Sequence, residues 1–325
     1  LTPLELGSST GAMMNNVGKV KNTGVEISLS TVNVQTKDFY WSTTFSFAKN
    51  KNEILELNGG KEDLVANKWF IGQPIDVIYD YEYAGVCTAE EARAYATNDA
   101  IKTKFIEGEM KLKDQQQPGE EGYGVIDEND LVVLGHALPK WTGSVTSNMT
   151  YKNFDFSFSI YTKQGGMVES PFMAEFTNYK DRGRNKLKMD YYIPAGTPVL
   201  NADGSGYTLT TEAHMGAYPY PTNTANNNYG GGIGWGTDKQ TTYVGNSYVD
   251  NSFVKIKNIT LGYTFPKSWM SKIGVDHLRL YVNVLNPFTF TSYKGFDPEW
   301  ADAALNDGTG GPSSRTYQVG VNLKF

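Results

Sequence analysis

Residues 317–325 read YQVGVNLKF, in which Tyr, Val, Val, Leu and Phe alternate with Gln, Gly, Asn and Lys. An apolar side chain at every second position is typical of a β-strand that has one face in water and the other in an apolar medium. Six further stretches show this alternation, and they are 25–30, 39–47, 143–149, 154–160, 259–265 and 278–284. The sequence therefore predicts seven strands and an all-β fold.

Charge separates the two faces of these predicted strands. The positions that carry the apolar side chains, which we call the apolar phase, contain no charged residue in any of the seven. The charges fall on the positions between, the polar phase, and they are Glu26, Asp155, Arg279 and Lys324. Because a Lys or Arg that faces lipid at mid-bilayer costs about 2–4 kcal/mol, this pattern favours a lipid-facing apolar phase and a water-facing polar phase.

Composition limits the possible partners and the kind of membrane segment. The 325 residues carry a net charge of −6 without a run of five like charges, so we expect no nucleic-acid partner, because phosphate binding needs a basic surface. The single cysteine, Cys87, excludes an internal disulfide. The longest unbroken apolar run is 131–134, whereas a membrane helix needs about 20 mostly apolar residues and a membrane strand needs about 9–11. Only strands could therefore cross a membrane.

The connections between the predicted strands alternate between short turns and long loops, which is typical of an outer-membrane β-barrel. The short ones are 33–38, 152–153 and 266–276, and the long ones are 51–140, 163–252 and 291–314. Aromatic residues that suit a membrane interface gather beside the short turns, and they are Phe39, Trp41, Tyr151, Phe154, Tyr263, Phe265, Trp269 and Phe325. The sequence therefore predicts a transmembrane antiparallel β-barrel with long extracellular loops. A soluble β-sandwich, whose inner faces also alternate, is the alternative.

The sequence does not indicate catalysis. His136, His214 and His277 lie in separate loops or turns, without the spacing of a metal site or a catalytic triad. Glu90 and Glu91 could imitate the two carboxylates of a glycosidase, but adjacent carboxylates in loops are ordinarily solvated surface. We therefore expect that the chain is not an enzyme.

The long loops are where we expect local structure and binding. Thr88 as an N-cap, with Glu91 three residues later, predicts a helix over 88–104. Aromatic side chains among Asn, Thr and Gly in the later loops suit contact with a substrate or with a partner protein, and ordinary loop packing is equally compatible with them. These candidate binding residues are Phe172, Tyr179, Tyr220, Tyr229, Trp235 and Tyr243.

Several stretches resemble the SusC/RagA group of TonB-dependent outer-membrane transporters. They are 16–26 (NVGKVKNTGVE), 72–85 (GQPIDVIYDYEYAG), 253–266 (FVKIKNITLGYTFP), and 278–286 (LRLYVNVLN) followed by 295–299 (GFDPE). Asp76 and Asp80 depart from the pattern, because glycine is usual there in the family. The stretches span nearly the whole chain in the family's order, so the resemblance is specific.

The resemblance implies that residues 1–325 are the C-terminal part of such a barrel. They would form about seven strands of a larger plugged barrel of about 22 strands, whose plug and N-terminal strands are not in this chain. The odd number agrees with this, because bacterial single-chain barrels close with an even number of strands. The resemblance also implies contact with membrane lipid in the outer membrane of a Gram-negative bacterium.

The resemblance further implies an active importer with a lid. A SusD-like surface lipoprotein would cover the outer loops, TonB would act through a segment outside this chain, and the cargo would be glycans or oligopeptides. Two other functions stay open. One is a secreted carbohydrate-binding or carbohydrate-degrading β-sandwich protein, and the other is a passive porin, although the long loops and the family motifs count against a porin.

The last strand has a predicted role of its own. Gln318, Gly320, Leu323 and Phe325 are similar to the C-terminal signal that the barrel-insertion machinery reads. An edge strand that happens to end in Phe is the alternative.

Residues 113–130 lie where transporters of this group often carry an EF-hand-like calcium loop. Here Tyr123 replaces the central Asp and the spacing is altered, so the early oxygen ligands of a calcium loop are missing. We therefore expect no metal or other cofactor. Asp127 and Asp130 are weak candidates for Ca²⁺ in an extracellular loop, and a plain turn is the alternative.

Overall fold

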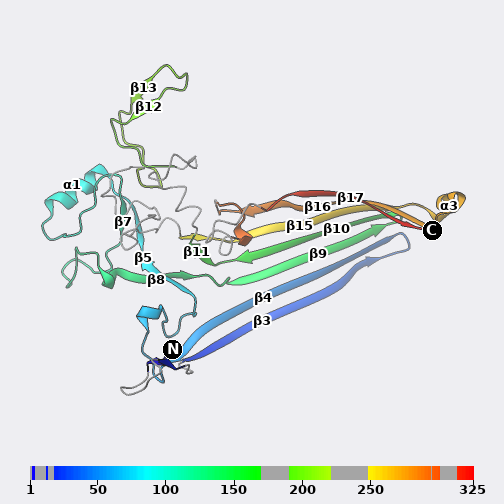
Figure 1. Cartoon of the computed structure of the whole chain (residues 1–325), viewed down its shortest axis with the longest axis horizontal. Coiled ribbons are helices and arrows are strands. Elements are labelled where there is room, and N and C mark those ends of the chain that lie inside the picture. The colour runs from blue at the N-terminus through cyan, green and yellow to red at the C-terminus, as the bar shows by residue number, and fades with distance from the viewer. Residues whose placement is uncertain are drawn as a thin grey trace.

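The computed structural model describes residues 2–3, 12–13, 18–169, 190–220, 248–293, 295–300 and 313–325. Its largest element is one seven-stranded antiparallel sheet with the order β17-β16-β15-β10-β9-β4-β3 (Figure 1). The strands are β3 (Gly18–Gln35), β4 (Phe39–Leu57), β9 (Trp141–Tyr151), β10 (Phe154–Gln164), β15 (Phe253–Thr264), β16 (His277–Thr291) and β17 (Thr316–Lys324). Each covers all or nearly all of one alternating stretch, so the seven predicted strands are confirmed.

The register of the sheet keeps the apolar phase of every strand on one face. Leu261 on β15 lies opposite Val282 on β16, and Val282 lies opposite Val319 on β17. At the opposite edge of the sheet, Ile27 of β3 lies opposite Phe47 of β4. Because side chains alternate between the faces of a strand, this pairing gives the sheet one apolar face and one polar face.

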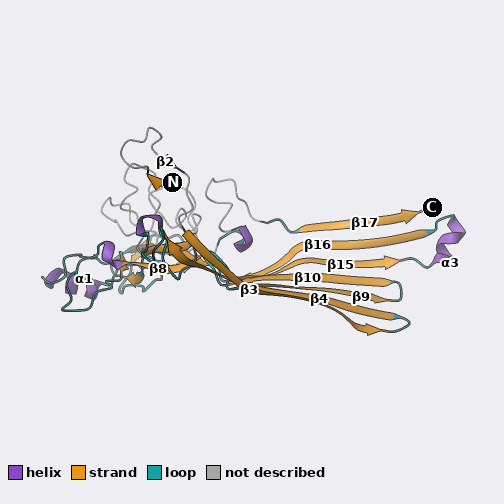
Figure 2. Cartoon of the chain, turned by 90° about the horizontal axis from the view of Figure 1, so that it is seen from below, coloured by secondary structure: helices purple, strands orange, loops and turns teal. Residues whose placement is uncertain are grey.

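The apolar face is open. Leu261 is 52% exposed and Val319 is 80% exposed, and Figure 2 shows the strands as a single layer along the part of the sheet that leads to α3. In a β-sandwich these side chains would be buried between two sheets. No second sheet of the described residues covers them, so the sandwich alternative does not describe this fold.

The short and long connections lie at opposite ends of the sheet, as expected. One end, the short-turn end, holds the β3–β4 and β9–β10 turns together with α3 (Lys267–Met270) and η4 (Ser271–Ile273), which join β15 to β16 (Figure 1). The other end, the loop end, holds the described parts of the long connections and their small sheets. The strands β3 and β17 form the two edges, so the described sheet is open rather than closed into a barrel.

Two strands are longer than a bilayer requires. β3 has 18 residues and β4 has 19, whereas a membrane strand needs about 9–11. Their extensions toward the loop end carry charged side chains, with Lys19 bound to Glu56 at 2.5 Å and Lys51 bound to Glu53 at 2.9 Å. In this hairpin, charged residues therefore replace the apolar band before the strands end.

The residues of the first long loop fold into a small unit, residues 77–136, which we call the loop body. It contains β5 (Val77–Tyr81) paired with β8 (Leu131–His136), β6 (Tyr83–Val86) paired with β7 (Met110–Leu112), and α1 (Ala89–Thr97). Its core is built from Cys87, Phe105, Met110 and Leu112. Burial is the largest of the causes that raise the pKa of Cys87 to about 11, so this thiol stays protonated at neutral pH.

The predicted helix of the loop body is confirmed with a shorter length. The Thr88 hydroxyl accepts a hydrogen bond from the Glu91 N–H at 3.1 Å, and the Glu91 carboxylate accepts one from the Thr88 N–H at 2.9 Å. This capping box begins α1, which ends at Thr97 rather than at 104. At its C-terminal end, Asn98 has an extended backbone and ends the helical hydrogen bonding.

The remaining elements are short. They are β1 (Thr2–Pro3), β2 (Ala12–Met13), β11 (Met167–Glu169), β12 (Pro198–Leu200), β13 (Tyr207–Leu209), β14 (Tyr248–Asp250), η1 (Val65–Asn67), η2 (Glu128–Asp130) and η5 (Pro298–Trp300). Three further two-stranded sheets pair β1 with β2, β11 with β14 and β12 with β13. None of the described helices is long and apolar enough to cross a membrane.

Candidate functional site

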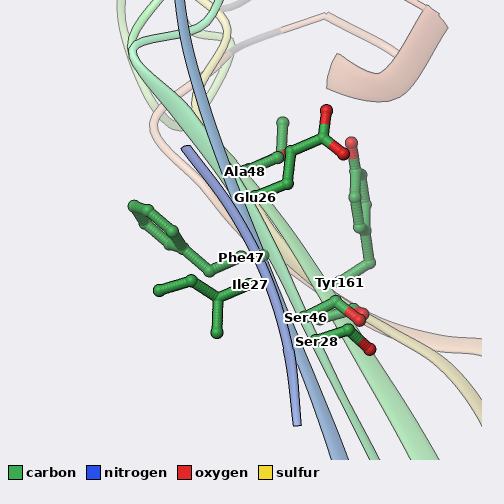
Figure 3. Close-up of a pocket in the computed structure, with 10 residues that line it drawn as sticks. Glu26, Ile27, Ser28, Ser46, Phe47, Ala48 and Tyr161 are labelled. Carbon is green, nitrogen blue, oxygen red and sulfur yellow. The ribbon is translucent and has the colours of Figure 1, made fainter. Parts of the chain in front are cut away.

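Part of the polar face of the sheet presents hydroxyl groups together with the carboxylate of Glu26. A hollow in this part of the face is lined by residues that include Glu26, Ser28, Ser46, Ser144 and Tyr161. Figure 3 shows Glu26, Ser28, Ser46 and Tyr161 on one side of the strands, while Ile27 and Phe47 project from the other side. Such a surface can exchange hydrogen bonds with a hydrated polar solute, because each hydroxyl both donates and accepts.

Nearer the short-turn end, an ion pair crosses the polar face above a glycine. The Arg279 guanidinium donates two hydrogen bonds to the Asp155 carboxylate, at 2.8 Å and 2.5 Å. Gly262 lies opposite Asp155 in the register, and a Cβ at this position would come within 2.4 Å of an Asp155 oxygen. The pair can therefore span β15 only because residue 262 has no side chain.

Two residues of the predicted insertion signal have structural roles on the same face. Gly320 lies opposite Tyr281, and a Cβ there would come within 2.2 Å of the Tyr281 ring. Gln318 accepts a hydrogen bond from Asn283 at 2.9 Å, and Asn283 accepts one from Thr260 at 2.9 Å. The other two residues of the signal, Leu323 and Phe325, belong to the apolar phase and are exposed. The insertion signal itself stays a prediction.

A buried ion cluster lies at the loop end of β15, and no pattern in the sequence predicts it. Lys255 is 1% exposed, and its ammonium donates to Asp297 at 2.6 Å and to Glu299 at 2.9 Å. Lys257 binds the same Glu299 carboxylate at 2.5 Å. We call these four residues the ion cluster. It fixes η5, in the loop after β16, to the neighbouring strand.

The carboxylates of the ion cluster are held in their charged form. Burial alone would raise the pKa of Asp297, but the hydrogen bond from Lys255 and a second one from Ser313 more than offset it, so the net shift is downward. The pKa of Glu299 is likewise lowered, because hydrogen bonds from Lys257 and Lys255 outweigh its burial. Part of this cluster lies in the stretch 295–299, which resembles a family motif. Nothing in that stretch indicates that Lys255 is the partner of its two carboxylates.

Only one of the six candidate binding residues falls in the described part of the chain. Tyr220 is half-buried, its N–H donates to the Gly108 carbonyl at 2.8 Å, and a Cβ at Gly108 would come within 2.7 Å of the Tyr220 Cβ. Tyr220 therefore packs segment 190–220 onto the loop body. Its predicted role in binding stays a prediction. The other five, Phe172, Tyr179, Tyr229, Trp235 and Tyr243, lie outside the described residues.

Asp80, one of the two departures from the family pattern, joins distant segments. Its carboxylate accepts hydrogen bonds from the Tyr81 N–H at 2.8 Å and from the Tyr248 hydroxyl at 2.5 Å. A glycine at this position could form neither side-chain bond. The Asp80 side chain therefore links β5 to β14.

The calcium candidates act as hydrogen-bond acceptors within their own turn. The buried Asp130 carboxylate accepts from the Gln115 N–H at 2.7 Å and from the Asp127 N–H at 2.9 Å, and Asp127 accepts from the Asn129 N–H at 2.8 Å. Within the described ranges, no three His, Cys, Asp or Glu side chains are grouped so that they could hold a metal ion. Ca²⁺ binding through Asp127 and Asp130 stays a prediction.

The histidines and the acidic pair are not brought together. His214 binds Asp190 at 2.6 Å in an exposed position. Glu91 caps α1 and forms an ion pair with Lys111, so this carboxylate of the acidic pair has a structural role. The absence of a catalytic site stays a prediction.

The described residues form one large antiparallel sheet with one open apolar face, one hydroxyl-rich polar face and the described loops at one end. This combination defines a class of protein, because it is typical of part of the wall of a membrane β-barrel.

The comparisons with known proteins agree with this class. No protein-family model matches the chain. The chain is 29% identical over 99% of its length to TonB-dependent receptor P3 of Formosa agariphila, and 27% identical over 99% of its length to TonB-dependent receptor SusC of Bacteroides thetaiotaomicron. The solved structure of the RagAB peptide transporter matches 99% of the chain with a TM-score of 0.63 at 22% identity, which supports the same fold. The resemblance to SusC/RagA-type TonB-dependent transporters is confirmed.

The chain spans about a third of the proteins it matches. It covers 30% of receptor P3, 28% of SusC and 31% of the RagAB chain. These relatives are receptors or transporters by name, and what each of them carries is a property of that protein.

Proposed function

We propose that the chain is the C-terminal part of the barrel wall of an active importer in the outer membrane of a Gram-negative bacterium. The observation that carries the proposal is the open apolar face, where residues such as Leu261 and Val319 are exposed on a single-layered sheet. In water this face would expose a large contiguous apolar surface, which soluble monomers rarely do. In a bilayer it meets hydrocarbon.

The remaining wall and the plug belong to other parts of the same transporter. Among the described residues no strand pairs with the outer sides of β3 and β17, and in lipid the backbone groups there need partners. Further strands that pair with these two edges would complete a barrel of about 22 strands. The plug would fill the lumen against the polar face, and TonB would act on it through a segment outside this chain.

The cargo in this proposal is a glycan or an oligopeptide. The hydroxyl groups on the polar wall suit either class, because both expose many hydrogen-bonding groups. A SusD-like surface lipoprotein would close over the long loops, as the pairing in the name RagAB and the match to SusC suggest by analogy. The wall would guide the cargo without making or breaking a bond.

The membrane placement is tested with a matched pair of lysine substitutions in the full-length transporter. L261K puts a charge on the apolar face, where it costs up to about 2–4 kcal/mol in lipid, whereas T260K puts the same charge on the polar face. We expect L261K to lower the amount of folded protein in the outer membrane, measured by heat-modifiable mobility, and T260K to leave it near the wild-type amount. Equal losses in both variants would contradict the assigned faces.

The import function is tested by uptake. Cells that express the full-length transporter should accumulate labelled oligosaccharides or labelled oligopeptides only while the TonB system is energised. Uptake that persists without TonB would point to a passive porin, and uptake of neither class would contradict the proposed cargo.

A further inference from the structure

The short-turn end of the sheet carries a row of exposed lysines. They lie in the β3–β4 turn, the β9–β10 turn and the β15–β16 connection, and they are Lys37, Lys152, Lys267 and Lys272. The acidic residues in these same turns are Asp38 and Asp276. Four positive side chains against two negative ones make these turns basic, although the chain as a whole has a net charge of −6. We call the four lysines the lysine rim.

Backbone hydrogen bonds join the rim into one continuous edge. The Lys152 N–H donates to the Asp38 carbonyl at 2.7 Å, which links the first two turns. The Thr264 N–H donates to the Asn153 carbonyl at 2.8 Å, and the Asp276 N–H donates to the Lys324 carbonyl at 2.8 Å. The lysines are therefore presented by a fixed frame that crosses the whole sheet.

The rim lysines differ in their partners from three lysines of the loop end. At the loop end Lys19, Lys51 and Lys255 each bind a carboxylate. In the part of the chain that the structure describes, no ion pair includes a lysine of the rim. Their charge is thus available to an anion from outside the chain.

Exposed apolar side chains accompany the rim. In the β15–β16 connection, Met270 and Val275 are buried, while Trp269 is 56% exposed and Ile273 is 67% exposed. Trp269 lies in α3 and Ile273 lies in η4, so both exposed side chains belong to one short helical segment. Tyr151 and Phe325 are also exposed at this end, and they extend the apolar face of the sheet to the rim.

We infer that the lysine rim binds the headgroups of anionic phospholipids in the leaflet that faces the periplasm, which is the side of the short turns in bacterial outer-membrane barrels. This inference rests on the proposed function, because it requires the apolar face to lie in a bilayer. Trp269 and Ile273 would enter the boundary between headgroups and acyl chains, where Trp rings are favoured. Lys267 and Lys272 on the same short segment would meet the phosphates.

The lysine rim should bind anionic lipids in preference to zwitterionic lipids. A lysine near an anionic membrane surface gains about 1 kcal/mol, which corresponds to about fivefold in affinity. A zwitterionic headgroup gives much less, since its net charge is zero. The rim should therefore enrich phosphatidylglycerol over phosphatidylcholine around this end of the barrel.

The experiment measures quenching of Trp269 by brominated lipids in the reconstituted full-length transporter. The bilayers contain phosphatidylglycerol and phosphatidylcholine, with the bromine on one or the other, and the signal of Trp269 is the difference between wild type and W269F. We expect severalfold preferred quenching by brominated phosphatidylglycerol. The variant K267Q/K272Q should bring the two lipids close to equal while Trp269 stays quenched.

The control pair K61Q/K68Q removes two lysines from the first long loop and should keep the preference. A preference unchanged in K267Q/K272Q would overturn the inference. A further probe, V319W in the W269F background, separates this inference from the proposed function. If V319W is quenched and Trp269 is not, the turn faces water or a periplasmic protein and only the inference falls. If neither is quenched, the membrane placement falls as well.

Discussion

The sheet and the loop body use apolar side chains in opposite ways. In the sheet, Val319 and Leu261 lie on an open face, and protein contacts come from strands that are neighbours in the register. In the loop body, Cys87 and Met110 are fully buried, in a core that also draws on Phe105 and Leu112. The loop body therefore contains its own core, whereas the apolar face of the sheet needs a medium that the described protein does not supply.

The ion cluster ties a loop to the sheet, and its loss should cost more than any other change considered below. K255M leaves the carboxylates of Asp297 and Glu299 without their buried cation, and breaking a buried pair in this way costs about 3–5 kcal/mol. We expect faster amide hydrogen exchange in 295–300 of the full-length transporter.

The matched control for this variant is K113M in the loop body. Lys113 binds Glu82 at 2.9 Å, but both side chains are largely exposed, so the loss should be at most about 1 kcal/mol. Similar exchange in K255M and wild type would show that the ion cluster does not hold the loop.

Truncation of an apolar side chain should destabilise the loop body more than the sheet. M110A removes a fully buried side chain from the loop body and should destabilise it by about 2–5 kcal/mol, because a cavity remains. V319A removes a side chain from the open face and creates no cavity, so its effect on unfolding in a bilayer should be below about 1 kcal/mol. Limited proteolysis within residues 77–136 and heat-modifiable mobility measure the two regions separately. A loss of mobility shift in M110A would mean that the loop body and the sheet unfold as one unit.

Acidification should change the stability of the ion cluster and of the loop body in opposite directions. The lowered pKa values of Asp297 and Glu299 mean that the ion cluster stabilises above their ordinary values of 3.8 and 4.5, and that this contribution is lost as the pH falls through the lowered values. Burial raises the pKa of Glu109 in the loop body, although a hydrogen bond from the Ile106 N–H partly opposes the shift. Its contribution is therefore present below the ordinary value of 4.5 and is lost as the pH rises through the raised one.

Hydrogen exchange at a series of pH values measures both effects. Protection of 295–300 should fall as the pH drops below about 4, while protection around residue 109 should hold or increase. The variant E109Q should remove the pH dependence around residue 109 and leave that of 295–300 unchanged. The same pH trend in both regions would contradict the opposite shifts.

The smallest expected effect is the loss of one helix cap. T88A removes the hydroxyl that accepts from the Glu91 N–H, and such a loss costs about 0.5–2 kcal/mol. We expect faster exchange in α1 with little change elsewhere, whereas T88S should behave like wild type because it keeps the hydroxyl. If T88A and T88S are equally perturbed, the cap hydrogen bond is not what holds the helix.

The strands could be predicted because their signal is local. In the sheet, the face on which a side chain lies follows from its position in a two-residue repeat, so the exposed Leu261 and Val319 and the polar Thr260 were placed correctly from the sequence. The loop body has no such repeat. Asp80 binds Tyr248 across 168 positions of sequence, and no periodicity connects these two residues.

The candidate site was predictable only in part, for the same reason. Tyr220 was chosen as an aromatic residue in a polar loop, but its packing over Gly108 depends on a contact between separate segments. Lys255 was part of a recognised motif, yet its partners Asp297 and Glu299 lie more than 40 positions away. Burial of a charge is decided by tertiary contacts, which a charge pattern along one strand does not reveal.

The ion pair between Asp155 and Arg279 determines which charge a solute would meet on this part of the polar face. The two side chains cancel each other's charge where they cross β15, so in the proposed transporter a solute that moved along the wall would meet a dipole there instead of a fixed ion. A permeation path works only if a solute is not retained at any one point. A self-compensated pair would avoid an electrostatic trap for cations and for anions alike, and it would leave the speed of passage to whatever drives the solute forward.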